Sequence, residues 1–318
     1  MSRILIVAPA FNEEQGIDQF VAAIDALRIR LQPHHELRLL IVDDGSTDGT
    51  MARLRALAAR HLDWCSYLGF AANAGHQAAM IAGLWHGAAW PDAAITMDAD
   101  LEHPVETVPD LIAAWERSRA VIVQARRLPT VELSWTKRWP SAAFYRLTSW
   151  LTGLKLEPGH ADFRLWDAAI LRNVRPYLVN VGSLRVFAAW LPGPKETIEY
   201  RQHVRADRQS RFTLRKNLHL AAISIVRFSH APLTAITVLG AIGLIFSFLY
   251  GSWAVIVAWQ GRAIPGWSST VLVVMTMGCL QLVSLGILAS YLRRLVFARD
   301  LPPFVIRENG PDLLARDQ

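Results

Sequence analysis

The chain has 318 residues, enough for one large domain or for a domain with a smaller module. Apolar residues make up 52% of it and charged residues only 19%, so it is more apolar than an average soluble domain. The formal net charge of +6 suits an anionic membrane surface or an anionic substrate. The basic residues form no dense tract with interleaved aromatic residues, and we therefore expect no nucleic-acid partner.

Short apolar runs alternate with amphipathic stretches over the first 124 residues. The apolar runs predict buried parallel strands at residues 3–8, 37–42, 67–70, 93–97 and 120–124. The amphipathic stretches predict helices at residues 14–31, 47–60, 77–90 and 105–117. This alternation predicts an α/β domain with a doubly wound, mostly parallel, Rossmann-like sheet. Polar motifs follow the strands, at the sheet edge where ligands bind in such folds.

Two later segments, residues 231–258 and 268–291, contain no charged residue. Each is longer than the roughly 20 residues that a helix needs to cross a bilayer, so we expect a transmembrane hairpin within residues 230–298. A pair of buried core helices is the alternative. Arginines are more frequent on the outer flanks than in the short connector, which has only Arg262. The positive-inside rule therefore predicts a cell (inner) membrane protein whose catalytic domain is cytoplasmic.

The regions beside the predicted hairpin are amphipathic or polar. Residues 139–154 and 211–229 predict amphipathic helices that lie in the headgroup layer, although ordinary surface helices have the same pattern. Residues 299–318 are expected to form a loose cytoplasmic tail. The catalytic domain would then occupy residues 1–210.

Asp98 and Asp100 follow the fourth predicted strand and are separated by one residue. Two carboxylates at a turn with this spacing can face the same point, as a hard cation that bridges to a diphosphate requires. Such a triplet is often only a solvated turn. Its position, in a series of polar motifs at strand ends, favours a site for Mg²⁺ or Mn²⁺.

Two other polar motifs follow the second and third predicted strands. Asp43 and Asp44 can accept hydrogen bonds from a base or a ribose, while Gly45 permits a tight turn. A simple helix cap by Thr47 or Asp48 is compatible with that role. Residues 73–77 form a polar loop whose backbone amides can face phosphate, and within it His76 is either a ligand or a packed side chain. No P-loop and no G-x-G-x-x-G motif is present, which argues against kinase-like and dehydrogenase functions.

Taken in chain order, these motifs resemble those of family-two glycosyltransferases with the GT-A fold. The resemblance extends from Ile4 to about Tyr291 and is closest to the polyprenyl-phosphate branch, which includes bactoprenol glucosyltransferases and dolichol-phosphate mannose synthases. It implies metal-dependent, inverting transfer of a sugar from a nucleotide-sugar donor to polyprenyl (undecaprenyl) phosphate at the lipid bilayer. It also implies a UDP-linked donor, with UDP-glucose first among several sugars that stay open, and a homo-oligomer such as a tetramer.

The resemblance assigns roles to individual residues. Nucleotide-sugar binding is expected of the P-x-x-N-E residues, the D-D-G-S pair, the loop after the third strand, the first D-x-D carboxylate and an incomplete G-x-R-x-x-R pattern: Pro9, Asn12, Glu13, Asp43, Asp44, Asn73, Gly75, Asp98, Arg126 and Arg127. Metal binding falls to Asp98 and Asp100. The D-x-D and D-F-R-L motifs supply the catalytic set Asp100, Asp162 and Arg164. The family's R-x-x-G-x-S-K-Y segment supplies an acceptor-phosphate clamp of Arg205, Ser210 and Arg211.

The sequence departs from the family pattern in places. The glycine of the clamp is Arg208 here, its lysine is Arg211 and its tyrosine is Phe212. Two other functions remain open from the sequence. One is a family-two enzyme with a different acceptor, which the lack of a Q-x-x-R-W motif and the two predicted spans disfavour. The other is a non-catalytic membrane subunit that binds nucleotide-sugar, which the intact D-x-D disfavours.

Overall fold

The computed structural model describes residues 1–128, residues 160–201 except 180 and 182, residues 304–313, and scattered helical positions between 249 and 292. The chain divides into two units. The first comprises Met1–Tyr145, Lys155–Ser210 and Pro302–Gln318, and the second comprises Arg146–Leu154 and Arg211–Leu301. The sheet and every site residue that the structure describes belong to the first unit.

Every strand and helix predicted within the first 124 residues is present, with ends within three residues of the prediction. The strands of the described chain are β1 (Ser2–Ala10), β2 (His35–Asp43), β3 (Cys65–Phe70), β4 (Ala93–Thr96), β5 (Ile122–Arg127), β6 (His160–Asp167), β7 (Lys195–Tyr200) and β8 (Ile306–Asn309). The helices are α1 (Ile17–Leu31), α2 (Thr50–Arg60), α3 (His76–Gly87), the single 3₁₀ turn η1 (Val105–Thr107), α4 (Val108–Ser118), α6 (Ala168–Leu178) and α7 (Leu184–Trp190).

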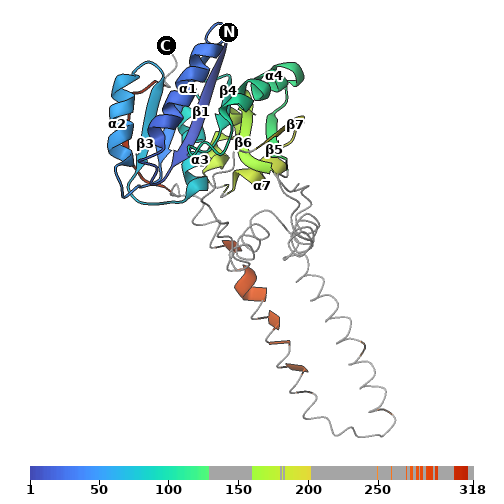
Figure 1. Cartoon of the computed structure of the whole chain (residues 1–318). Coiled ribbons are helices and arrows are strands. Elements are labelled where there is room, and N and C mark those ends of the chain that lie inside the picture. Colours follow the sequence, from blue (N-terminus) through green and yellow to red (C-terminus); the bar gives the residue numbers. More distant parts are fainter. Residues whose placement is uncertain are drawn as a thin grey trace. The chain divides into compact units, whose positions relative to one another are not determined.

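The strands form one sheet in the order β7-β5-β6-β4-β1-β2-β3-β8 (Figure 1). Neighbours among β4, β1, β2 and β3 are parallel, whereas β6 is antiparallel to β4 and β5, and β8 is antiparallel to β3. The α/β class with a mostly parallel sheet is confirmed, but the doubly wound parallel pattern holds only for the central strands. The direction of β6 could not be predicted, because Phe163, Leu165 and Trp166 are buried and a buried strand has the same apolar pattern in either direction.

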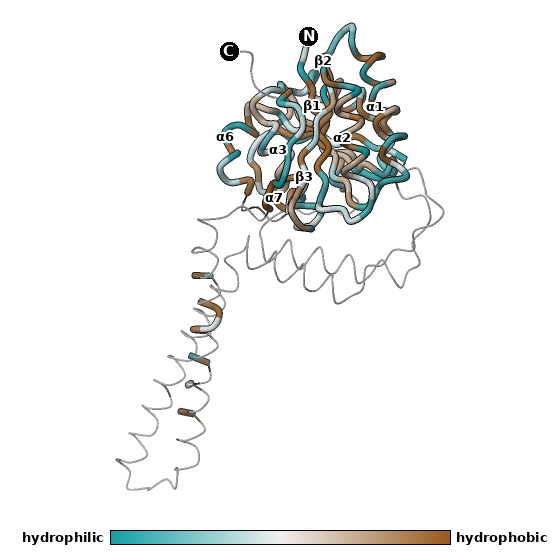
Figure 2. The backbone as a smooth tube through the Cα atoms, turned by 90° about the vertical axis from the view of Figure 1, so that its left-hand side faces the viewer, coloured by the Kyte–Doolittle hydropathy of each residue, from teal (hydrophilic) through white to brown (hydrophobic). Residues whose placement is uncertain are grey.

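Helices cover both faces of the central strands. On one face, side chains of α1, α2 and α4 form a continuous core with alternate residues of β1, such as Ile4 and Ile6. On the other face α3 lies close to the sheet, since a Cβ added at Gly83 would be 2.3 Å from Val7. Figure 2 shows the hydrophobic colour of β1 running through the middle of this domain. These two layers hold the carboxyl ends of β1 to β4 at one edge.

The C-terminal segment differs from its prediction. Residues 304–313 are not a loose extension, because they contain β8 and return to the sheet along β3. Glu308 accepts two hydrogen bonds from Arg55 at 2.9 and 2.8 Å, and Phe304 stacks on Phe70 with ring centroids 5.2 Å apart. A strand of four residues with two charged side chains carries too weak a local pattern to be recognised, and only the free edge of β3 selects it.

Within the described residues, no helix is both long enough and apolar enough to cross a bilayer. The predicted spans at 231–258 and 268–291 lie outside the described residues except for scattered helical positions. The predicted amphipathic helices at 139–154 and 211–229 lie wholly outside them.

The docking of the C-terminal segment depends on Gly310. Its N–H donates to the Tyr67 carbonyl at 2.8 Å, and a Cβ at this position would lie 2.7 Å from Tyr67 Cδ1 and 3.0 Å from Tyr67 N. We expect Gly310→Val to separate the segment from β3 and to accelerate amide hydrogen exchange at residues 304–313. Val305→Ala is the matched control, since the Val305 side chain is exposed. Equal exchange in the two variants would show that the close contact does not hold the segment.

Candidate active site

A cleft of about 330 Å³ lies at the carboxyl ends of β1 to β4. Parallel strands bring these ends to one edge, so motifs far apart in the sequence meet there. Of the predicted site residues, the cleft brings together Pro9, Glu13, Asp44, Asn73, Gly75, Asp98 and Asp100. Its lining also includes Ala10, Phe11 and His76, which the resemblance did not assign.

Asp44 connects the end of β2 to the loop that precedes α3. Its buried carboxylate accepts the N–H of Ala74 at 2.7 Å, the N–H of Gly75 at 3.0 Å and the side-chain amide of Asn73 at 3.1 Å. Burial raises the pKa of Asp44, and the bonds from Ala74 and Gly75 and the nearby His76 partly offset this. The N–H donors of the loop therefore stabilise the anionic form of Asp44, and the carboxylate in turn fixes the conformation of the loop.

Asp43 and Asn12 lie outside the cleft lining. Asp43 is buried and accepts the backbone N–H of Ser46 at 3.1 Å as well as the Ser46 hydroxyl. Asn12 accepts the N–H of Thr47 at 2.9 Å through Oδ1. Both residues hold the turn after β2 against the turn after β1. Gly45 has φ +69° within this turn, and a Cβ there would lie 2.6 Å from the Ala72 carbonyl carbon, so glycine is required as the sequence predicted.

Asp98 is placed by two histidines. Its Oδ1 lies 3.2 Å from His76 Nε2, and its backbone N–H donates to His103 Nδ1 at 3.0 Å. Because His103 Nδ1 accepts this bond it carries no proton, so its 3.7 Å approach to Asp98 Oδ2 is not an ion pair. His103 is buried and stacks on Phe163 with ring centroids 5.0 Å apart. No motif in the sequence assigned a role to His103, although it lies only three residues after Asp100.

The charge on His76 responds to its carboxylate neighbours. Burial lowers the pKa of His76, but the hydrogen bond to Asp98 and the charges of Asp98, Asp162 and Asp100 raise it, and the net shift is upward. A proton on His76 is therefore stabilised beside the cleft. This is an electrostatic role that the loop's sequence alone did not distinguish from packing.

The two D-x-D carboxylates fit a divalent cation. Asp98 and Asp100 both line the cleft, and Asp100 is oriented by the N–H of Glu102, which donates to its Oδ1 at 3.0 Å. No group of three or more His, Cys, Asp or Glu side chains in the described chain is arranged to hold a metal by itself. Mg²⁺ is commonly held by one or two carboxylates, with water and substrate phosphates as the other ligands. The donor set therefore suits a cation that arrives with, or is completed by, a phosphate ligand.

Asp162 and Arg164 lie on β6, beside β4 but outside the cleft lining. Gln77 donates to Asp162 Oδ2 at 2.8 Å and accepts the N–H of Leu184 at 2.9 Å. The guanidinium of Arg164 is buried, and its Nη1 donates to the Leu184 carbonyl at 3.0 Å. Burial lowers the pKa of Arg164 to about 10, so it stays cationic at neutral pH.

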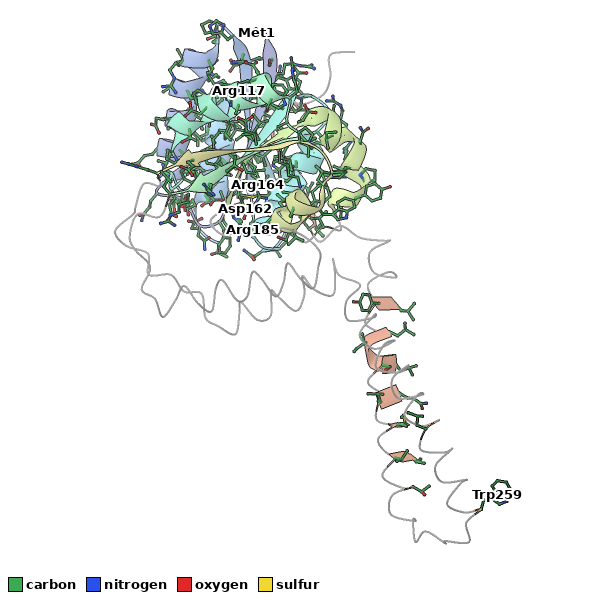
Figure 3. The ribbon with its side chains drawn as sticks, turned by 90° about the vertical axis from the view of Figure 1, so that its right-hand side faces the viewer. Met1, Arg117, Asp162, Arg164, Arg185 and Trp259 are labelled. Carbon is green, nitrogen blue, oxygen red and sulfur yellow. The ribbon has the colours of Figure 1, made fainter. Side chains whose placement is uncertain are left out.

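Arg185, on α7, is the second cation beside Asp162. Its Nη2 lies 3.7 Å from Asp162 Oδ2. Figure 3 shows the Asp162 label between those of Arg164 and Arg185, near the edge of the domain. Sequence reasoning missed Gln77 and Arg185. Gln77 is the last residue of the polar loop 73–77 but had no role of its own there, whereas Arg185 lies in a stretch without any recognised motif.

The remaining predicted residues are not brought to the cleft or lie outside the described chain. Arg126 forms an ion pair with Glu199 across β5 and β7, and Arg127 is exposed. Neither lines the cleft. The predicted acceptor clamp of Arg205, Ser210 and Arg211 lies outside the described residues.

Comparison with known proteins identifies the family. Residues 5–174, more than half of the chain, match the family described as Glycosyl transferase family 2. The SfII prophage-derived bactoprenol glucosyl transferase of Shigella flexneri is 30% identical over 309 residues, which cover 96% of this chain and 98% of that protein. The prophage bactoprenol glucosyl transferase homolog of Escherichia coli strain K12 is 29% identical over 307 residues, with the same coverage.

Solved structures are less similar. The crystal structure of mannosyl-3-phosphoglycerate synthase from Rubrobacter xylanophilus matches 76% of this chain and 75% of its own, with 17% sequence identity and a TM-score of 0.45. The resemblance inferred from the motifs is confirmed by the family match and by the two relatives. The chain therefore belongs to glycosyl transferase family 2 and is a glycosyltransferase with an α/β fold of the GT-A type.

Proposed function

We propose that this enzyme transfers a sugar, with inversion, from a nucleoside-diphosphate sugar to polyprenyl phosphate at the cytoplasmic face of the cell membrane. The observation that carries the proposal is the similarity to bactoprenol glucosyl transferases over 96% of this chain, which extends well beyond the catalytic sheet. Undecaprenyl phosphate is the acceptor to test, and UDP-glucose is the first donor.

The cleft supports binding of a nucleotide-sugar. Asp44 and the loop that it holds present oxygen acceptors and backbone amides at the ends of β2 and β3, where a nucleoside and its phosphates can be bound. A divalent cation, Mg²⁺ or Mn²⁺, held by Asp98 and Asp100 would supply a Lewis acid for the diphosphate. His76, whose pKa is raised by the neighbouring carboxylates, lies on the same side of the cleft, with its Nε2 3.2 Å from Asp98 Oδ1.

The proposed reaction requires little proton transfer by side chains of the protein. An oxygen of the acceptor phosphate forms a bond to the anomeric carbon, the bond from that carbon to the donor diphosphate breaks, and the nucleoside diphosphate leaves with the electron pair. The attacking oxygen is already anionic near neutral pH, so a strong general base is not needed. Asp162, held by Gln77, therefore serves to position the reactants.

Exposed apolar side chains support a membrane location. Among the described helical positions of the second unit, Val274, Leu285, Leu288 and Leu292 are all exposed. Apolar surface of this kind is unfavourable in water and favourable in lipid. Together with the charge-free segments and their basic flanks, this favours a hairpin in the bilayer with the catalytic unit in the cytoplasm. Assembly into a homo-oligomer stays a prediction.

The proposed reaction and its metal can be tested together. Transfer from radiolabelled UDP-glucose, and from a panel of other nucleotide sugars, to undecaprenyl phosphate is measured in detergent with Mn²⁺, Mg²⁺ or EDTA. We expect label in the lipid phase from one donor, and its loss with EDTA. We expect Asp100→Asn to lower transfer by about 100-fold or more, since a weakened metal site removes several kcal/mol of charge stabilisation.

Asp63→Asn is the matched control for this experiment. Asp63 is an exposed aspartate in the turn before β3 and is not part of the cleft lining. It should leave transfer unchanged. Metal-dependent transfer at the wild-type rate by Asp100→Asn would contradict the assigned metal site. If the folded protein gave no lipid-linked label with any donor, undecaprenyl phosphate would not be the acceptor.

A further prediction concerns the loop that Asp44 holds. Asp44→Ala leaves donors from Ala74, Gly75 and Asn73 without their acceptor, which we expect to lower the free energy of unfolding by about 1–3 kcal/mol and to weaken UDP binding. Asp44→Asn keeps one acceptor oxygen and should have the smaller effect. Calorimetric titration with UDP and denaturant unfolding measure the two quantities. Wild-type UDP affinity in Asp44→Ala would refute the role of this loop in donor binding.

A further inference from the structure

The charged groups around Asp162 form a cluster whose net charge is positive, whereas carboxylates predominate in the cleft. Two guanidinium groups, those of Arg164 and Arg185, flank one carboxylate at 4.0 and 3.7 Å, so the cluster has an excess of one positive charge (Figure 3). Both distances exceed that of a hydrogen bond. Within the described chain, Arg164 Nε and Nη2 and Asp162 Oδ1 are buried without any hydrogen-bond partner. Buried polar groups are rarely left unpaired, and such a set is explained by an absent ligand or water.

Arg185 is the member of the cluster that a ligand can reach. Its side chain is 44% exposed, whereas that of Arg164 is 1% exposed. Asp162 Oδ2, the oxygen that faces Arg185, already accepts a hydrogen bond from Gln77. Arg185 donates no hydrogen bond to any residue that the structure describes, so its planar set of N–H groups is available to an anion.

The position of Arg185 relative to Asp162 is fixed by Gln77. The two ends of this amide bind Asp162 on β6 and the N–H of Leu184, the residue directly before Arg185. Arg164 adds a third connection through its bond to the Leu184 carbonyl. Gln77 and Arg164 therefore both hold the start of α7 near Asp162. Their bonds to Leu184 fix the backbone directly before Arg185.

The cleft and this cluster suit different anions. Among the described residues, the cleft lining contains four carboxylates, Glu13, Asp44, Asp98 and Asp100, and no lysine or arginine. A diphosphate bound there needs a cation as well. The cluster at Asp162 carries its own positive charge and lies one strand farther along the sheet, beside β4. The proposed reaction has two anionic reactants, and the molecule offers two electrostatically distinct places for them.

We propose that Arg185 binds the phosphate group of the polyprenyl phosphate acceptor next to Asp162, an inference that rests on the proposed function. The guanidinium fork matches two oxygens of a phosphate monoester. The neighbouring carboxylate of Asp162 repels the phosphate oxygens and keeps the pair from being fully neutralised, so the attacking oxygen stays nucleophilic. Gln77 is then a positioning residue, acting through Asp162 and α7.

The test is equilibrium binding by the full chain in detergent micelles, with undecaprenyl phosphate and undecaprenol as the two probes. We expect the wild type to prefer undecaprenyl phosphate, and Arg185→Gln to reduce that preference by about 10- to 100-fold, as for the loss of a hydrogen bond to a charged group. Arg185→Lys should restore part of it. UDP affinity should stay within about twofold in both variants, which also shows that they are folded.

Arg53→Gln is the matched control. Arg53 lies on α2, and its side chain is 49% exposed. It forms an ion pair at 2.8 Å with a single carboxylate, that of Asp18 on α1. It should keep the full preference for the phosphate. An unchanged preference in Arg185→Gln, no preference in the wild type, or an equal loss of UDP binding would each overturn the proposal. Transfer activity is measured separately: Arg185-dependent binding without transfer would refute the proposed function while supporting this phosphate site.

Discussion

The buried carboxylate of Asp44 organises the edge of the sheet on which the cleft depends. An anion at the end of a buried strand is stable only if donors surround it, and here the donors come from the loop after β3. That loop leads directly into α3, whose first turn carries His76 and Gln77. The loop held by Asp44 therefore leads both to His76, which lines the cleft, and to Gln77, which donates to Asp162.

The reversed strand β6 determines which residues lie beside the turn that contains Asp98 and Asp100. Because β6 is inserted between β4 and β5, its residues Asp162 and Arg164 lie next to the strand that leads to Asp98 and Asp100. The same strand contributes Phe163, which stacks on His103 and so supports the backbone of Asp98. Strand β6 thus supports the turn of Asp98 through Phe163 and supplies Asp162 and Arg164 to the charged cluster.

The C-terminal segment belongs to the first unit, although most of the second unit precedes it in the sequence. After leaving the first unit at residue 210, the chain returns at residue 302 and pairs β8 with β3. The Val305 carbonyl accepts the N–H of Ala71 at 2.9 Å, at the start of the loop that Asp44 holds. The returning segment therefore supports the loop that Asp44 holds, and the chain after the apolar segments contacts the sheet through β3.

The sequence alone was sufficient for the central strands, the helices between them and seven residues of the cleft, because apolar periodicity and motifs at strand ends are local signals. It also led to the family. It did not reveal the direction of β6, the pairing of β8, the turn-stabilising roles of Asp43 and Asn12, or the contributions of Gln77, His103 and Arg185. Those depend on partners such as Gln77 and Leu184, 107 residues apart, which no local pattern connects. Only the tertiary structure decides them, because a side chain's partners are set by which strands become neighbours and in which direction they run.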